Sequence, residues 1–393
     1  MRPIIWARRS SRRNPPQILP RWQRSTQSDA SSMSISSPRL RQNNFDLIRL
    51  LLALAVCLLH AHELSGASEL GIIDTLLSGK IAIESFFVIS GFLIFMSYEK
   101  SRSLTSYFEK RARRIYPAYF VSVTLAAILL SSISDRSLSA YFLSSEFAQY
   151  LTTNLAFLNF LQPDLPGVFT ENRMAAVNGA LWTIKIEVMF YLSVPVIVWL
   201  CRRLGRSRIL LALFVASTAY SLIMFHLHES TGRGMYFQLE KQLPGQLRFF
   251  IAGAALYYLL PFFERHVKWL VLAAAIYFLA RPLIEVEALK PIALAILVIF
   301  FALYNYVGNF CKFGDFSYGV YILHFPIVQT MVHFGAFEAN AWLALLATVG
   351  LTLCAAALMW HGVEKRWLHK NSHYVQAGQE GQSDAPGSKA RAR

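Results

Sequence analysis

The chain has 393 residues, of which 55% are hydrophobic and only 16% charged, whereas soluble domains carry about 25% charged residues. The apolar residues come in blocks, and the blocks 115–133, 209–225 and 291–310 contain no charged residue. Because a helix crosses a bilayer with about 20 mostly apolar residues, and because soluble helices keep a polar face, a soluble helical enzyme is excluded. The sequence predicts an all-α, polytopic membrane helix bundle.

The two ends of the chain differ from these blocks in composition. Residues 1–44 are rich in Arg, Ser and Pro and predict a disordered, basic cytoplasmic arm, with Met33 as an alternative natural start. Residues 365–393 are polar and predict a disordered cytoplasmic tail. Between them, residues 45–364 form the predicted membrane domain.

About ten transmembrane helices are predicted in this domain. Their approximate limits are 45–60, 80–98, 115–133, 180–200, 209–226, 249–263, 267–280, 291–310, 316–332 and 341–363. The sixth and seventh are short. Segment 141–161 reads as a re-entrant or interfacial helix, which leaves eleven spans as an alternative count.

The distribution of positive charge sets the expected orientation. With ten spans, the arm, four loops and residues 364–370 share one side, which holds 25 Lys and Arg, and the opposite loops hold 7. Positive residues concentrate on the cytoplasmic side, so both termini are predicted to be cytoplasmic, in the plasma (inner) membrane. Much of the net charge of +15 is therefore a topology signal, and no nucleic-acid partner is expected. The four cysteines form no CxxC pair, so no metal site is predicted.

The first predicted span carries two ionisable residues, which are expensive inside a bilayer and point to function by default. Arg49 and His60 lie eleven residues apart, which places them on one helix face about 16 Å apart along the axis. The functional interpretation is that Arg49 and His60 act together in one functional site within the membrane. The alternative is an anchoring arginine with an unrelated polar histidine.

The fourth predicted span contains Glu187 at a depth similar to that of His60. A buried carboxylate needs a partner, and a carboxylate that orients an imidazole makes a general base. We therefore expect Glu187 to pair with His60. Lys185 lies on a different face, and Tyr191 follows one turn after Glu187 on the same face.

Three further groups of residues have both a structural and a functional interpretation. Arg111 and Arg114 share a helix face at the cytoplasmic lip of the third span, either as topology anchors or as a phosphate clamp. Ser90, followed by a glycine, indicates close helix packing in mid-membrane or a substrate contact. Tyr321 and His324 lie on one polar stripe with Tyr318, as core residues or as substrate contacts.

Taken together, these segments resemble the acyltransferase-3 family of integral-membrane acyltransferases. The resemblance rests on R-x10-H in the first span, FFVISGF in the second, RxxRIYPAY in the third, LWTIKIEVMFYL and FGDFSYGVYILHFPI, all in the family's order. It implies that His60 is the catalytic histidine and Arg49 its partner, that Arg111 and Arg114 hold the donor, and that Glu187 fills the family's acidic position. Lys110 and Arg366 depart from the common pattern, where Arg and Pro are usual.

The resemblance implies an enzyme that moves an acyl group, most simply acetyl, from acyl-CoA to a sugar hydroxyl of a bacterial surface or exported glycan. Exopolysaccharide, O-antigen and lipid-linked oligosaccharide all fit as acceptors. Acyl-CoA is then a co-substrate, and no permanently bound cofactor is expected. We expect His60 to act as general base in direct transfer, because no Ser or Cys lies in a recognisable nucleophile elbow. An acyl-enzyme on Ser90 stays open as an alternative.

The rival class is a multi-span transporter or flippase that uses His60 and Glu187 as a proton relay. Transporters of this kind show inverted repeats and paired Gly/Pro interruptions, and the sequence shows neither. A membrane glycosyltransferase would need an acidic diad in the first outer loop, where Glu63, Glu69 and Asp74 are not adjacent.

Overall fold

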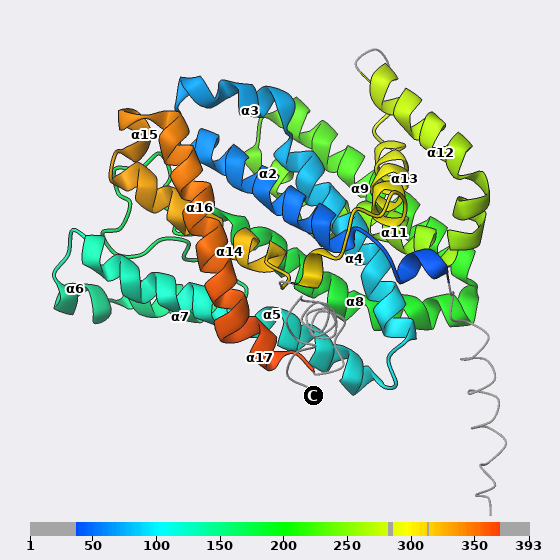
Figure 1. Cartoon of the computed structure of the whole chain (residues 1–393), viewed down its shortest axis with the longest axis horizontal. Helices are drawn as coiled ribbons and strands as arrows, with labels where there is room; N and C mark the ends of the chain where they lie inside the picture. Colours follow the sequence, from blue (N-terminus) through cyan, green and yellow to red (C-terminus); the bar gives the residue numbers. More distant parts are fainter. Residues whose placement is uncertain (1–36, 282–285, 313, 370–393) are drawn as a thin grey trace, which may run out of the picture. The chain divides into compact units, whose positions relative to one another are not determined.

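The structure is a computed structural model that describes residues 37–281, 286–312 and 314–369. These residues belong to one structural unit that begins at Ser37. The described part of the chain contains helices and no strand, which confirms the predicted helical bundle (Figure 1). The predicted arm up to residue 36 and the tail from residue 370 lie outside the described residues.

Ten of the helices in the described residues have 14 residues or more and make up the body of the unit. They are α2 (Phe45–Ser65), α4 (Gly79–Glu99), α5 (Leu104–Leu129), α8 (Trp182–Leu204), α9 (Arg206–Thr231), α11 (Leu243–Tyr258), α12 (Leu260–Ala280), α13 (Lys290–Leu303), α14 (Ser317–His333) and α16 (Ala341–Met359). The shorter α-helices are α3 (Gly71–Leu76), α6 (Leu138–Phe142), α7 (Ser145–Leu155), α10 (Gly234–Glu240), α15 (Ala336–Ala339) and α17 (Lys365–Trp367).

Within the described residues, six helical segments are long and apolar enough to cross a membrane, and up to seven if the α10–α11 and α12 pair counts as one span. That pair is bent by 108°. Helices α13 and α14 are shorter, with 14 and 17 residues. The protein is thus multi-pass, but the predicted number of ten spans is not confirmed, since hydropathy does not reveal a sharp bend or a short helix.

Helices α4 and α11 pack with their backbones in close contact. At Gly91 of α4 an added Cβ would collide with the carbonyl of Phe250, and at Gly253 of α11 it would collide with the carbonyl of Val88. Each glycine therefore fits against the backbone of the other helix. The expected close approach next to Ser90 is confirmed, and it fixes the wall of α4 that faces the pocket described below.

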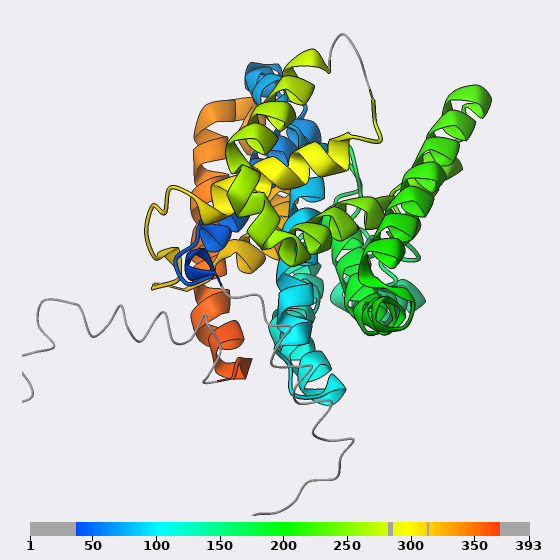
Figure 2. The ribbon, with the colours of Figure 1, turned by 90° about the vertical axis from the view of Figure 1, so that its right-hand side faces the viewer.

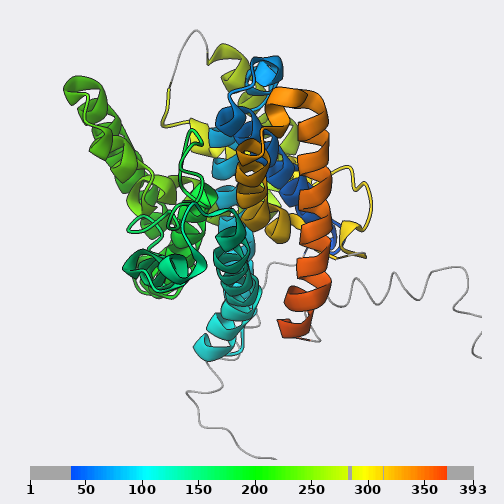
Figure 3. The same ribbon diagram turned by 90° about the vertical axis from the view of Figure 1, so that its left-hand side faces the viewer.

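Helix α14 lies at the centre of the bundle, against α2 and α16 (Figure 1). Its carbonyl at Ile322 accepts hydrogen bonds from Ser122 of α5, at 3.2 Å, and from Asn178, at 2.8 Å. Its residues from Ser317 to Phe325 are all buried. In contrast, α9 projects from the side of the other helices (Figures 2 and 3), and only 22% of the residues in its most apolar 18-residue stretch are buried, as expected for a helix that faces lipid.

The predicted end of the N-terminal arm differs from the structure, whereas segment 141–161 agrees with the predicted short interfacial or re-entrant helix and not with an eleventh span. Asn44 is buried, and its side-chain amide donates to three carbonyls at the end of α13, at 3.0–3.2 Å. The end of the predicted arm at residue 44 therefore falls within folded chain. Segment 141–161 contains the end of α6 and all of α7. At 11 residues, α7 is too short to span a bilayer.

Candidate active site

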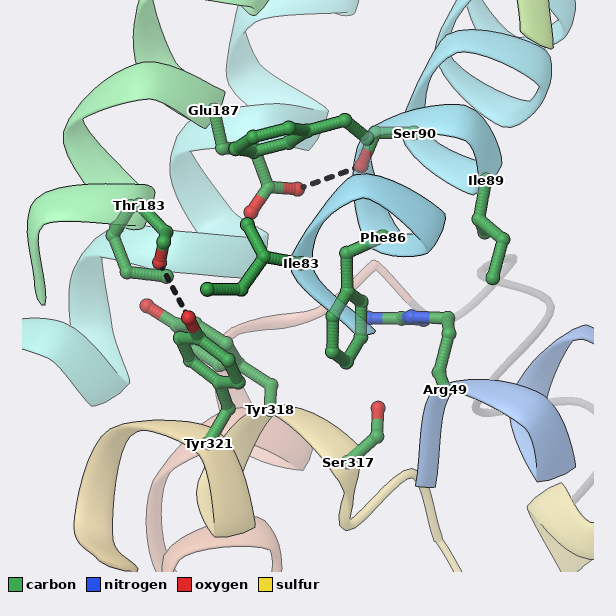
Figure 4. Close-up of a pocket in the computed structure, with 12 residues that line it drawn as sticks. Arg49, Ile83, Phe86, Ile89, Ser90, Thr183, Glu187, Ser317, Tyr318 and Tyr321 are labelled. Carbon is green, nitrogen blue, oxygen red and sulfur yellow. Dashed lines mark hydrogen bonds between the residues drawn. The ribbon is translucent and has the colours of Figure 1, made fainter. Parts of the chain in front are cut away.

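A pocket lies between α2, α4, α8 and α14 (Figure 4). Its empty volume is about 520 Å³, including the open solvent at its mouth. The lining residues are Arg49, Ile83, Phe86, Phe87, Ile89, Ser90, Thr183, Ile184, Glu187, Ser317, Tyr318 and Tyr321. Figure 4 shows Arg49, Glu187 and Tyr321 approaching this space from three helices. An apolar cleft with a few convergent polar groups is the usual form of a small-molecule site.

At the Arg49 end, the pocket borders a buried cluster of ion pairs. The guanidinium of Arg49 donates to Asp315 Oδ2 at 3.1 Å, and Arg114 of α5 donates to the same oxygen. Burial raises the pKa of Asp315, but Arg49 and Arg114 outweigh it and hold the pKa at about 2. Asp315, which lies just before α14, is therefore a carboxylate at neutral pH.

A second carboxylate completes this cluster. Arg114 Nη1 donates to Glu364 at 2.8 Å, and the side chain of Arg114 is only 8% exposed. Glu364 ends a five-residue π-helical segment, Trp360–Glu364, that follows α16. Such segments are often found at functional sites. The cluster thus joins α2, α5, the start of α14 and the end of α16.

Along the wall of α8, Glu187 makes two hydrogen bonds to pocket-side neighbours. Ser90 Oγ donates to Glu187 Oε1 at 3.4 Å (Figure 4), and the hydroxyl of Tyr191 donates to the same oxygen. The guanidinium of Arg111 lies 5.8 Å from the ring centroid of Tyr191 and donates to Ser97 at 3.1 Å. Arg111 does not line the pocket, and its contact with Tyr191 connects it to the lining residue Glu187.

At the opposite end, the pocket closes on aromatic rings. The ring of Tyr321 packs edge-on against Phe86, with centroids 5.5 Å apart, and its hydroxyl lies 2.7 Å from Thr183 Oγ1. One turn along α14, the ring of His324 lies 5.9 Å from that of Tyr321. His324 is completely buried, and it is the link between the pocket and His60.

His60 and His324 form a hydrogen-bonded pair of imidazoles. His60 Nδ1 lies 2.8 Å from His324 Nε2, and the two rings are nearly parallel, with an interplanar angle of 12°. His324 Nδ1 lies 3.0 Å from the carbonyl oxygen of Val320, in the previous turn of α14. His60 itself is half-buried, and the ring of Phe325 packs edge-on against it.

The chemistry of these groups fixes the direction of each hydrogen bond. A carbonyl oxygen only accepts, so His324 carries its proton on Nδ1 and, as a neutral ring, has a lone pair on Nε2. His60 must then donate from Nδ1 to that lone pair, which leaves His60 Nε2 unprotonated. The pair therefore holds His60 in the tautomer that can accept a proton.

The structure supports part of the expected geometry and corrects another part. Arg49 and His60 do share a face of α2, because both contact the segment from Asp315 to His324. The expected pairing of His60 with Glu187 is wrong: in the described part of the chain, His60 bonds His324 and Glu187 bonds Ser90 and Tyr191. An imidazole on α14 lies closer to His60 than the carboxylate on α8 does.

The structure also places three other predicted site residues, Ser90, Tyr321 and Arg114, and the in-membrane Lys185. Ser90 and Tyr321 line the pocket. Arg114 is held inside the ion-pair cluster, which is not the exposed position that a phosphate clamp suggests. Lys185, left without an assigned partner by the sequence, donates to Gln242 at 2.7 Å.

Sequence reasoning missed Asp315 and Glu364. Asp315 stands two residues before Ser317 in a segment from which only Tyr318, Tyr321 and His324 were selected. The signal that could have found them is the need of a buried arginine for a carboxyl partner. Asp315 directly precedes the ninth predicted span and Glu364 directly follows the tenth, so both were available as partners for Arg49 and Arg114.

The order and content of these helices agree with a known family. The profile of the acyltransferase domain, acyltransferase-3, matches residues 42–361, nearly the whole of the described unit. The chain belongs to the acyltransferase-3 family. It is therefore a membrane acyltransferase, which favours the enzyme over the transporter among the classes considered above.

Two relatives align over most of the chain, and another over one third of it. It is 27% identical to "Nodulation protein 10" of Rhizobium leguminosarum bv. viciae, over 82% of this chain and 92% of that protein. It is 28% identical to the "O-acetyl transferase" of Shigella phage Sf6, over 84% of this chain and 98% of that protein. "Acyltransferase MdmB" of Streptomyces mycarofaciens is 26% identical over 33% of this chain and 31% of its own length. No solved structure matches the chain.

Proposed function

We propose that this acyltransferase moves an acetyl group from acetyl-CoA to a sugar hydroxyl of a bacterial surface or exported glycan, at the inner membrane. The acceptor class is exopolysaccharide, O-antigen or a lipid-linked oligosaccharide. The name of the phage relative, which aligns over 98% of its length, supports the acetyl group. The observation that supports the mechanism is the His60–His324 pair, a base of defined tautomer. Neither histidine lines the pocket, but the ring of His324 lies 5.9 Å from that of Tyr321, which does.

In this mechanism His60 Nε2 takes the proton of the acceptor hydroxyl. As that O–H bond breaks, the oxygen attacks the thioester carbonyl carbon and forms a tetrahedral intermediate. The C–S bond then breaks, the ester remains on the sugar, and the departing thiolate takes the proton back from the imidazolium of His60. His324 keeps accepting from His60 Nδ1, so it orients the base throughout the step.

The donor is proposed to enter at the Arg49 end. Its phosphates meet the guanidinium of Arg49, which lines the pocket, with Arg111 as a second contact nearer the helix ends. Arg49 and His60 are separated by about 16 Å along α2, a distance that an extended pantetheine arm bridges. The thioester would then reach the ring cluster around Tyr321 and His324.

Glu187 and Ser90 form the side wall of this path. We propose that Glu187 accepts a hydrogen bond from a substrate hydroxyl or amide, in addition to those from Ser90 and Tyr191. An acyl-enzyme on Ser90 is the second candidate mechanism, because the hydroxyl of Ser90 lies 3.4 Å from a carboxylate that could take its proton. Trapping of the chain with labelled acetyl-CoA separates the two mechanisms: label on Ser90 favours the acyl-enzyme.

The proposed function is tested by mass spectrometry of surface and exported glycans from strains with and without the gene. Loss of a mass equal to one acetyl group, restored by the wild-type gene and not by His60→Ala, is the expected result. Unchanged glycan masses in the deletion strain would contradict the proposed acceptor class. A lost group of succinyl mass would replace acetyl as the transferred group.

A further inference from the structure

Asp315 has more ionic and hydrogen-bonding partners than its place in a short turn requires. Its Oδ2 accepts from Arg49 at 3.1 Å and from Arg114. Its Oδ1 accepts from the backbone N–H of Ser317 at 3.1 Å and from the hydroxyl of Ser317 at 2.5 Å. Both oxygens are thus engaged, and the side chain is only 1% exposed. The turn that carries Asp315 is therefore tied to α2, to α5 and to the first turn of α14.

The backbone just before Asp315 is also constrained. Gly314 adopts a φ of 127°, which residues other than glycine rarely adopt. A Cβ at this position would also collide with the indole of Trp360. Trp360 opens the π-helical segment whose last residue, Glu364, binds Arg114. The cluster is thus held in place from the α16 side as well as from α2 and α5.

The cluster brings two guanidiniums together with buried carboxyl groups. Asp315 binds both Arg49 and Arg114, Glu364 binds Arg114, and Asp46 of α2 lies 3.9 Å from Arg49 Nη1. Of these five residues, only Arg49 also lines the pocket. Removal of the charge of Asp315 would leave two guanidiniums close together with one carboxylate fewer, and like charges at this range repel.

We propose that Asp315 is a positioning residue for acyl transfer, which holds the guanidinium of Arg49 at the pocket wall so that it meets the anionic end of the acyl donor. This inference rests on the proposed function. Asp315 should affect donor binding and not the proton transfer, because its partner Arg49 lies about 16 Å along α2 from His60. Asp315 touches neither the thioester nor the acceptor in this account.

The test compares two donors that differ in their phosphates. Acetyl-CoA carries phosphates, and S-acetylpantetheine has the same thioester arm without them. Binding of each is measured by calorimetry to the purified full chain in nanodiscs. Asp315→Asn should raise the Kd for acetyl-CoA roughly tenfold, as expected for loss of a contact between charged groups, and leave that for S-acetylpantetheine unchanged.

The matched control is Glu109→Gln. It removes the exposed ion pair between Glu109 and Arg113, at 2.8 Å, on the same helix as Arg114, and should change neither Kd. If Asp315→Asn weakens both donors equally, or neither, the positioning role is overturned. If it does not fold, Asp315→Glu decides, because it keeps the charge but moves it by one methylene: an intermediate Kd for acetyl-CoA is expected, and wild-type behaviour overturns the inference.

A second readout separates this inference from the proposed function. If the wild-type chain binds neither donor, the proposed donor is wrong, but Asp315 can still be judged by modification of Arg49 with phenylglyoxal, followed by mass spectrometry. Release of Arg49 in Asp315→Asn should speed its modification severalfold relative to wild type and to Glu109→Gln. An unchanged rate would show that Asp315 does not hold Arg49.

Discussion

Replacement of His324 by Leu tests the assigned tautomer of the base. Leu removes the Nε2 acceptor that lies 2.8 Å from His60 Nδ1, so the Nδ1–H loses its partner. A buried donor without a partner costs about 1–3 kcal/mol. In His324→Leu this cost destabilises the His60 tautomer that carries its proton on Nδ1 and has Nε2 free to accept one. The rate constant for acyl transfer should therefore drop roughly 5- to 150-fold, with the Kd for acetyl-CoA unchanged.

The assay is a single-turnover measurement with radiolabelled acetyl-CoA and membrane glycan as acceptor. His324→Gln is the matched control, because the Gln amide oxygen can accept from His60 Nδ1 where the imidazole nitrogen stood. It should retain more activity than His324→Leu. Equal rates for the two variants, or an undiminished rate for His324→Leu, would refute the argument that His324 fixes the tautomer of His60.

Three further predictions concern stability. The two arginines beside Asp315 hold its pKa below the ordinary value of 3.8, at about 2. The ionised Asp315 therefore contributes about 2 kcal/mol to the free energy of unfolding, and this contribution is complete above pH 3.8 and lost as the pH falls through 2. The Tm difference between wild type and Asp315→Asn should be constant over neutral pH and shrink in acid. Gly91→Ala should destabilise the protein by about 1–3 kcal/mol through overpacking, whereas Gly350→Ala, with open space around it, should have a Tm at or above that of wild type. Lys290→Met removes the partner of the buried Glu84, 2.8 Å away, and should lower the free energy of unfolding by about 3–5 kcal/mol. Adding Glu84→Met should recover part of this loss. A double variant less stable than Lys290→Met alone would contradict the reasoning.

Much of the fold was predictable because bilayer physics restricts the choices. Apolar blocks of about 20 residues predict membrane helices, and the long helices α2, α4, α8 and α16 coincide with predicted spans. The short helix α13 and the bend between α11 and α12 were not predictable in the same way. Their lengths depend on packing against neighbouring helices, which local hydropathy does not encode.

The sequence identified most residues of the site but did not identify which of them contact one another. In-membrane ionisable residues are rare, so Arg49, His60, Glu187 and His324 could be selected from the sequence. Which of them touch depends on how α14 is rotated between α2 and α16, and no periodicity in one helix gives that rotation. For this reason the pairing of His60 with His324, and the role of Asp315 as counter-ion, emerged only from the structure.

The central claim is that His60 Nε2 takes the proton of the acceptor hydroxyl. The most direct test measures acetyl transfer by purified His60→Ala together with its binding of acetyl-CoA. Transfer should fall by about 10²–10⁴-fold, the usual contribution of a general base, while the Kd for acetyl-CoA stays within about twofold of wild type. Undiminished transfer by a variant that still binds the donor would contradict the account.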